Sequence, residues 1–112
     1  FLVLTAPFAS LVHFAPYYFS NGFSKYWYDY HMNAHGFEIV ELEPIGDWYS
    51  YLRQELIRLP KMLKKSNSLY WGVSYAISAI MLFAVFLMKP SKDTKTSEVA
   101  CLGWMCLAKK IK

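Results

Sequence analysis

The chain has 112 residues, which suffices for one small domain and is too short for two. Hydrophobic residues make up 55% and aromatic residues 19%, against only 18% charged residues, and this composition excludes an intrinsically disordered chain. The net charge is +4, and the lysines behind it cluster at 61–65 and 89–112, on either side of an apolar segment. Because they do not alternate with aromatic residues along a groove, they favour solubility or attraction to an anionic membrane surface, and we expect no nucleic-acid partner.

The opening residues 1–8 form a short apolar run that stops at Pro7. Such a run predicts an interior strand buried on both faces, and it has neither the basic start nor the cleavage site of a signal peptide. In open α/β sheets, ligands bind beyond the carboxyl ends of the strands, so the loop over residues 8–19 is the first candidate site. The chain also begins inside this strand and without Met, which predicts that it is the C-terminal part of something longer.

Residues 23–35 predict a helix that ends at Gly36, because glycine favours a left-handed stop. Its apolar residues fall three and four apart and form one face: Phe23, Tyr26, Trp27, Tyr30 and Ala34. His31 and His35 have the spacing of a two-histidine metal site, but Met32 stands where an acid is expected, and no third ligand is evident. We therefore expect surface histidines and no metal.

Acidic and apolar residues alternate over 37–43, before Pro44 and Gly46 interrupt the pattern. Carboxylates along a strand suit an exposed edge of a sheet, where they discourage pairing with another chain. This segment is predicted to be an edge strand.

The period becomes helical from Asp47, which is a plausible N-cap. One stripe of this helix consists of Leu52, Leu56, Leu59 and Leu63. Pro60 lies within the pattern and predicts a kink or a division of the helix near Leu59. The amphipathic helix is expected to lie against something apolar, either its own sheet or a membrane surface.

Residues 66–88 carry no charge and are bracketed by Lys65 and Lys89. About twenty residues span a bilayer as a helix, and the Leu, Ile, Val and Phe residues here favour insertion by roughly 3 to 5 kcal/mol, which Gly72 and the Ser and Tyr residues partly offset. Lysines at both ends leave no orientation bias, although the aromatic residues within 70–75 resemble an interfacial belt. The segment is therefore a membrane span, a helix half-sunk in a membrane or a helix buried in the protein.

The last apolar run, over residues 98–108, is uncharged after Glu98 and apolar on both alternating faces. It predicts a central strand covered on both sides. Cys101 and Cys106 would then point to opposite faces, so we expect them to be buried thiols in a reducing compartment that neither pair nor share a metal. All three strand patterns are satisfied when the last strand lies between the other two and runs antiparallel to both.

One ordered set of motifs runs through these elements: Leu2-Val3-Leu4-Thr5-Ala6-Pro7-Phe8, His13, Pro16-Tyr17-Tyr18-Phe19, a helix ending at His35-Gly36-Phe37, and a strand ending at Ala108-Lys109-Lys110. The set resembles the C-terminal half of class I S-adenosylmethionine-dependent methyltransferases, especially the type 11 group. The resemblance covers residues 1–48 well and 97–110 fairly, and the helical segment at about 48–89 resembles a variable insertion.

The resemblance implies an α/β fold, in which this chain is the C-terminal part of a Rossmann-like sheet. Strands five, six and seven of that family close the sheet, with the last one antiparallel between the other two. Residues 1–112 would then be the C-terminal portion of a single methyltransferase domain. The family's glycine-rich loop and ribose-binding acid belong to earlier strands, and the five glycines here are too scattered to form a GxGxG turn. S-adenosylmethionine would bind the full-length protein, and the fragment alone is expected to be inactive.

Methyl transfer from a sulfonium depends mainly on positioning, so strong acid or base residues are optional. His13 could act as a base or orient the acceptor, or it could tie down its loop by hydrogen bonds. Tyr17 and Tyr18, together with Phe19, could line an acceptor pocket or form an aromatic lid. The residues that would border the methyl end of the cofactor, by family analogy alone, are Ala6, Pro7 and Phe8.

The resemblance implies a small-molecule or lipid-like methyl acceptor and, as partner, the N-terminal half of the same domain. The expected location is cytoplasmic, with or without a peripheral membrane contact through 69–88. Two other functions remain open. One is a small non-enzymatic membrane protein anchored by this apolar segment, and the other is a degenerate methyltransferase-like domain kept for binding.

Overall fold

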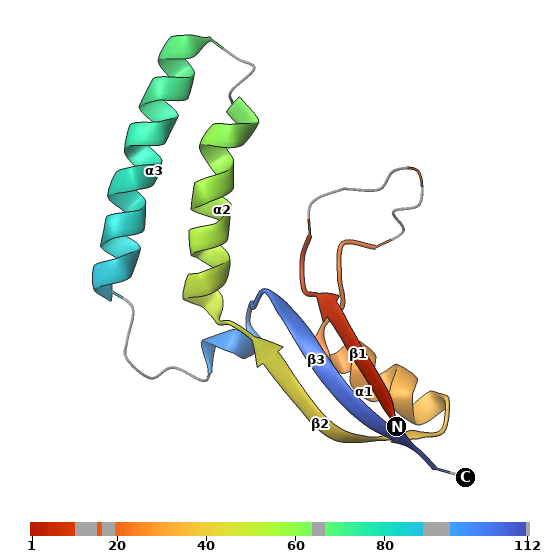
Figure 1. Cartoon of the computed structure of the whole chain (residues 1–112). Helices are drawn as coiled ribbons and strands as arrows, with labels where there is room; N and C mark the ends of the chain where they lie inside the picture. The colour runs from red at the N-terminus through yellow and green to blue at the C-terminus, as the bar shows by residue number, and fades with distance from the viewer. Residues whose placement is uncertain (11–15, 17–19, 64–66, 89–94, 112) are drawn as a thin grey trace.

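The computed structural model describes residues 1–10, 16, 20–63, 67–88 and 95–111 (Figure 1). The described chain combines a three-stranded sheet with three α-helices and one short 3-10 helix. In chain order the elements are β1 (Leu2–Pro7), α1 (Lys25–Ala34), β2 (Phe37–Ile45), α2 (Trp48–Leu63), α3 (Ser68–Met88), the 3-10 helix η1 (Thr96–Glu98) and β3 (Gly103–Lys110). The predicted α/β class is confirmed.

The strand order is β1-β3-β2, and β3 runs antiparallel to both neighbours (Figure 1). β1 and β2 are therefore parallel to each other, with the last strand of the chain between them. The sequence predicted this order and these directions, and both are confirmed. The predicted start of the last strand is wrong, because residues 98–102 are not part of it. The backbone N–H groups of Val99 and Ala100 donate to the carbonyl of Thr96, so the chain turns there before it enters the sheet.

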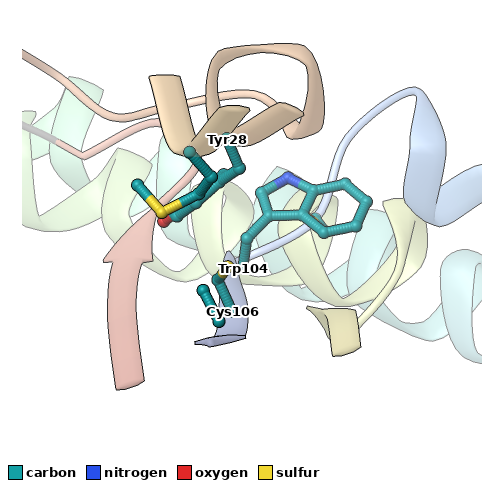
Figure 2. Close-up of a cluster of buried hydrophobic side chains, with 6 residues drawn as sticks. Tyr28, Trp104 and Cys106 are labelled. Atoms are coloured by element: carbon teal, nitrogen blue, oxygen red, sulfur yellow. The ribbon is translucent and has the colours of Figure 1, made fainter. Parts of the chain in front are cut away.

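One face of the sheet packs against α1 and forms the core. The buried apolar cluster consists of Tyr28, Met32, Cys101, Trp104, Cys106 and Ala108. Figure 2 shows Tyr28 reaching from α1 toward Trp104 and Cys106 of β3. The predicted burial of both faces is wrong, since Val3 on the other face of β1 is 64% exposed and Met105 on that of β3 is 36% exposed. Alternating exposure along β1 follows from the two-residue period of a strand with one covered face.

The two edges of the sheet differ in chemistry. β2 carries Glu38, Glu41 and Glu43, has a register shift between Ile39 and Glu41, and contains Pro44. These features blunt an edge, so the predicted edge strand is confirmed. β1 was predicted to be interior, yet it forms the opposite edge of the described sheet. It has no charged residue along Leu2–Pro7, so it is an edge without the protection that β2 has.

The predicted N-cap of α2 is confirmed, because Asp47 Oδ1 accepts a hydrogen bond from the backbone N–H of Ser50 at 2.8 Å. The helix is not divided at Pro60 and continues to Leu63. A proline so close to the end of a helix removes only one backbone bond, and its ring is buried. The buried stripe is therefore Leu56 with Pro60, whereas Leu59, expected on that stripe, is 42% exposed.

α2 and α3 pack against each other as a hairpin that stands away from the sheet (Figure 1). The chain measures 61 × 40 × 17 Å, and its radius of gyration is 17.7 Å, against ~13 Å for a compact chain of this length. An apolar groove of about 300 Å³ lies between the two helices, lined in part by Leu56, Trp71 and Tyr75. α3 is long and apolar enough to cross a membrane, with a mean hydropathy of 2.0.

Candidate functional site at the carboxyl edge of the sheet

The carboxyl ends of β1 and β2 lie at the same edge of the sheet, on either side of the start of β3. In the register, Gly103 is opposite Pro7 on one side and opposite Ile45 on the other. A shallow depression of about 260 Å³ lies there, lined by Thr5, Ala6, Pro7, Ile45, Leu102 and Gly103. Because ligands of open α/β sheets bind beyond the carboxyl ends of the strands, this edge is the candidate site.

Two glycines allow the backbone to close around this edge. A Cβ on Gly103 would lie 2.6 Å from the carbonyl oxygen of Ala6. Gly22 has a φ of +148°, and a Cβ there would collide with the carbonyl oxygens of Pro7 and Phe8. Only glycine fits such close approaches of backbone to backbone. Neither role can be predicted from the sequence, because the strand register that creates both approaches has no local signal.

Hydrogen bonds fix the two ends of the loop that follows β1. The backbone N–H of Phe23 donates to the carbonyl of Pro7 at 3.0 Å, and that of Phe8 donates to the carbonyl of Leu102 at 3.2 Å. Ser10 N–H donates to the carbonyl of Asn21. The chain therefore leaves β1 and returns to α1 at the same edge of the sheet, which places both ends of the predicted substrate loop beside the depression.

The structure places some of the predicted site residues and not others. Ala6 and Pro7 line the depression. Phe8 is half-buried and packs against the core cluster. The remaining predicted residues, His13, Tyr17, Tyr18 and Phe19, lie outside the described residues. Ile45 and Gly103 line the site without having been predicted, because they reach it through strand pairing.

The lining of the depression is uncharged, and Thr5 supplies its one side-chain hydroxyl. Such a surface can contact an apolar or neutral part of a ligand, but it has no group that exchanges a proton near neutral pH. It also lacks a carboxylate for ribose hydroxyls and a glycine-rich turn, so these residues do not hold S-adenosylmethionine by themselves.

A second, more polar cavity of about 330 Å³ lies on the α1 side of the sheet. Lys25 Nζ forms an ion pair with Glu98 Oε1 at 2.8 Å at its rim, and Asp29 and the buried Trp104 also line it. The hydrogen bond with Glu98 raises the pKa of Lys25, and the same bond lowers the pKa of Glu98. The ion pair joins α1 to η1, so its evident role is to hold the segment that leads into β3.

The buried ionisable groups of the core are kept neutral. Burial raises the pKa of Tyr28, with smaller contributions from Cys106 and Cys101, and burial also raises the pKa of both thiols. Both cysteines are free and buried, as predicted. They do not point to opposite faces of a strand, because Cys101 precedes β3 and both thiols lie in the α1-facing cluster. A neutral buried thiol is a poor nucleophile, which favours a structural role.

His31 in α1 and His35, the residue that caps its C-terminus, lie on the same side, as predicted. The ring centroids of His31 and His35 are 6.2 Å apart, and the rings are stacked. Within the described residues, no group of three or more His, Cys, Asp or Glu side chains comes together to hold a metal ion.

Comparison with known proteins adds no family to this geometry. No family model, curated protein or solved structure matches the chain.

Proposed function

We propose that this chain is the C-terminal, substrate-side portion of a class I S-adenosylmethionine-dependent methyltransferase domain. The observation that carries the proposal is the position of β3, which lies antiparallel between two mutually parallel strands. The methyltransferases that the sequence resembles close their sheet in the same way, with the seventh strand between the fifth and the sixth. In the proposal, β1, β2 and β3 correspond to the fifth, sixth and seventh strands.

The chemistry of the two sheet edges supports this assignment. The edge formed by β2 is blunted by glutamates and a register shift, as the outer edge of a finished sheet is. The edge formed by β1 is uncharged, and Val3 leaves its open face apolar and exposed. An unprotected edge of this kind invites a further strand, which the N-terminal half of the domain would supply.

The proposed roles of the site residues follow from the family resemblance and from the two ends of the loop, which lie at the carboxyl edge. His13 acts as a base or orients the acceptor, and the aromatic residues within 17–19 line the acceptor pocket and exclude water. Pro7 and Ala6 border the methyl end of the cofactor, and Phe8 anchors the loop to the core. The acceptor is a small or lipid-like molecule, and the enzyme is cytoplasmic. The cofactor itself is held by the N-terminal half.

Calorimetric titration with S-adenosylmethionine tests the proposal on the protein encoded by the complete reading frame, beside the 112-residue chain. The complete protein should release heat and the chain alone should not. In the complete protein, Pro7→Trp should weaken binding roughly tenfold or more, because the new ring occupies the depression. Glu41→Trp is the control and should leave binding unchanged, since Glu41 is exposed on β2, the outer edge of the proposed sheet, and lies away from the depression.

Two results would contradict the proposal. One is a complete reading frame without a strand and glycine-rich turn ahead of residue 1. The other is a complete protein that has this turn but releases no heat, which would assign the chain to a degenerate, non-catalytic domain.

A further inference from the structure

α3 has its small polar residues inside and its large apolar residues outside. Ser74, Ser78 and Val85 are its buried residues, and only 17% of its most apolar stretch is buried. Ile80 is 70% exposed and Phe86 is 77% exposed. A core helix of a water-soluble protein has the opposite arrangement, with its apolar face against the core. The outer surface of α3 is therefore suited to an apolar environment that the described chain does not provide.

The hairpin is amphipathic as a pair of helices, although α3 alone is not. α2 and α3 lie side by side (Figure 1). α2 packs along the serine side of α3, and it carries Arg53, Glu55, Arg58 and Lys61, whereas α3 carries no charge. Arg58 and Glu55 form an ion pair at 2.8 Å on α2. One layer of the hairpin is thus apolar and the other is charged, which is the division that a membrane surface requires.

The strand pairing excludes α3 as a single membrane span. Ile45 at the end of β2 lies opposite Gly103 at the start of β3, so both ends of the segment 46–102 return to the same place. If α3 crossed a bilayer, either α2 or the return segment 89–102 would have to cross as well. Charged residues oppose insertion strongly in both, four of them in α2 and others at Lys89 and Asp93.

The charges around α3 favour a lipid surface over another apolar partner. Lys61 is exposed at the end of α2, Lys64 and Lys65 follow it in the sequence, and Lys89 follows α3. Tyr70 and Tyr75 near the start of α3 are more than half exposed, as aromatic residues at a membrane interface are. Clustered lysines attract anionic headgroups, whereas a second copy of the chain would bring like charges together.

We propose that the α2–α3 hairpin lies in the plane of an anionic membrane surface, with α3 sunk to the boundary of headgroups and acyl chains. At 21 residues, α3 is about 31 Å long, and with its side chains it is roughly 10 Å wide. This width matches the roughly 5 to 10 Å to which interfacial helices sink into the boundary of headgroups and acyl chains. α2 lies above it and turns its charges to the headgroups. This proposal does not depend on the methyltransferase assignment.

Vesicle flotation of the full chain tests the proposal. The vesicles are phosphatidylcholine alone, and phosphatidylcholine with phosphatidylglycerol in equal parts. The chain should float with both and bind the anionic vesicles more tightly, and added salt should reduce the difference. Ile80→Glu should lower the partition coefficient about tenfold or more, because it places a carboxylate in the buried face. Val99→Glu is the matched control, since Val99 is 72% exposed and lies outside the hairpin.

The lysine contribution has its own pair of variants. Lys61→Ala should lower binding to anionic vesicles about five-fold and leave binding to neutral vesicles unchanged. Lys110→Ala, at the exposed end of β3, should change neither.

The orientation is tested with cysteines at the two ends of α3. Ser68→Cys, at the start of α3, and Lys95→Cys, at an exposed polar position beyond its other end, are bound to intact vesicles and treated with a membrane-impermeant maleimide, against which the buried native thiols give little background. Labelling of both ends from outside supports the in-plane position, and protection of one end would overturn it. The proposal is also overturned if the chain does not float, or if Ile80→Glu and Val99→Glu behave alike. A dimer that Ile80→Glu dissociates, without vesicle binding, would assign the face to a second copy.

Discussion

The sheet with α1 and the α2–α3 hairpin differ in the side chains that they bury. In the first unit, Tyr28 and Trp104 are almost completely buried between helix and sheet. In the second, Ser74 and Ser78 are buried beside a small apolar set, Leu56, Pro60 and Val85, while Phe86 is 77% exposed. The two units belong to one chain, and they are connected at the end of β2 and the start of β3.

This difference indicates how each unit is stabilised. The sheet with α1 removes large apolar surfaces from water within the chain itself, which contributes most of the stability of a fold. The hairpin gains less from such burial, because its buried apolar side chains are few and most of the apolar residues of α3 face outward. Its stability therefore depends on what covers α3, whereas the stability of the sheet unit does not depend on it.

The largest expected effect is that of Trp104→Ala, which opens a cavity between α1 and β3. Truncation of a buried Trp costs about 3 to 5 kcal/mol, enough to unfold most small domains. We expect the cooperative urea transition of the sheet unit to be lost, with the helical circular dichroism of α3 retained when vesicles are present. Trp71→Ala is the control, because Trp71 lies on α3 and is 38% exposed. An equal loss in the control would remove the distinction between the units.

Glycine-to-alanine substitutions should act in opposite directions in the two units. Gly103→Ala places a methyl group against the Ala6 carbonyl oxygen, and we expect a cost of about 1 to 3 kcal/mol. Gly72→Ala meets no atom within 4 Å in α3 and should stabilise the hairpin by ~0.5 to 1 kcal/mol through helix propensity. Denaturant unfolding in the presence of vesicles measures both. Two changes of the same sign would contradict the packing described for Gly103.

The sheet order could be predicted because charge marks each strand differently. Glutamates restrict β2 to an edge, and the uncharged run after Glu98 favours a place between neighbours. The sequence could not show that β1 is the other edge of the described sheet, because an apolar run looks the same whether or not a neighbour is present. It could not place the start of β3 either, since Ala100 and Cys101 suit a strand as well as the irregular segment that they occupy.

The candidate site was predictable only where it is local in sequence. Ala6 and Pro7 follow from the rule that sites lie at the carboxyl ends of strands, and both line the depression. Gly103 and Ile45 reach it through register, which no local pattern specifies. The inward face of α3 was equally hidden, because an uncharged helix has little amphipathic pattern to indicate which side packs.

Two serines of α3 test the interior of the hairpin on a smaller scale. The Ser78 hydroxyl is buried without a hydrogen-bond partner in the described structure, whereas Ser74 Oγ donates to the carbonyl of Trp71 at 2.8 Å. Ser78→Ala should stabilise the hairpin by up to about 1 kcal/mol, because it removes an unsatisfied group. Ser74→Ala should change stability by less than ~0.5 kcal/mol, since a better helix former offsets the lost bond. Destabilisation by Ser78→Ala would mean that its hydroxyl has a partner outside the chain.

The smallest effect is expected at the junction of the two units, where the ion pair between Lys25 and Glu98 joins α1 to η1. Lys25 lowers the pKa of Glu98 below its ordinary value of 4.5, so this contribution is complete above that pH and is lost as the pH falls through the lowered pKa. Glu98 raises the pKa of Lys25 above 10.5, so the contribution is also lost as the pH rises through that raised pKa.

Thermal unfolding of wild type and Glu98→Gln across pH measures this junction. Near neutral pH, the Tm of wild type should be slightly higher than that of Glu98→Gln. This difference should vanish at strongly acidic and strongly alkaline pH, and added salt should reduce it. Glu41→Gln is the control, because that exposed glutamate forms no ion pair within the described residues. The Glu98 side chain is 62% exposed, so water screens its ion pair with Lys25 and the pair is weak. A weak ion pair at this junction lets the hairpin adjust to a surface without straining the sheet. A large loss of Tm in Glu98→Gln would instead indicate that the junction is rigid and that the two units unfold together.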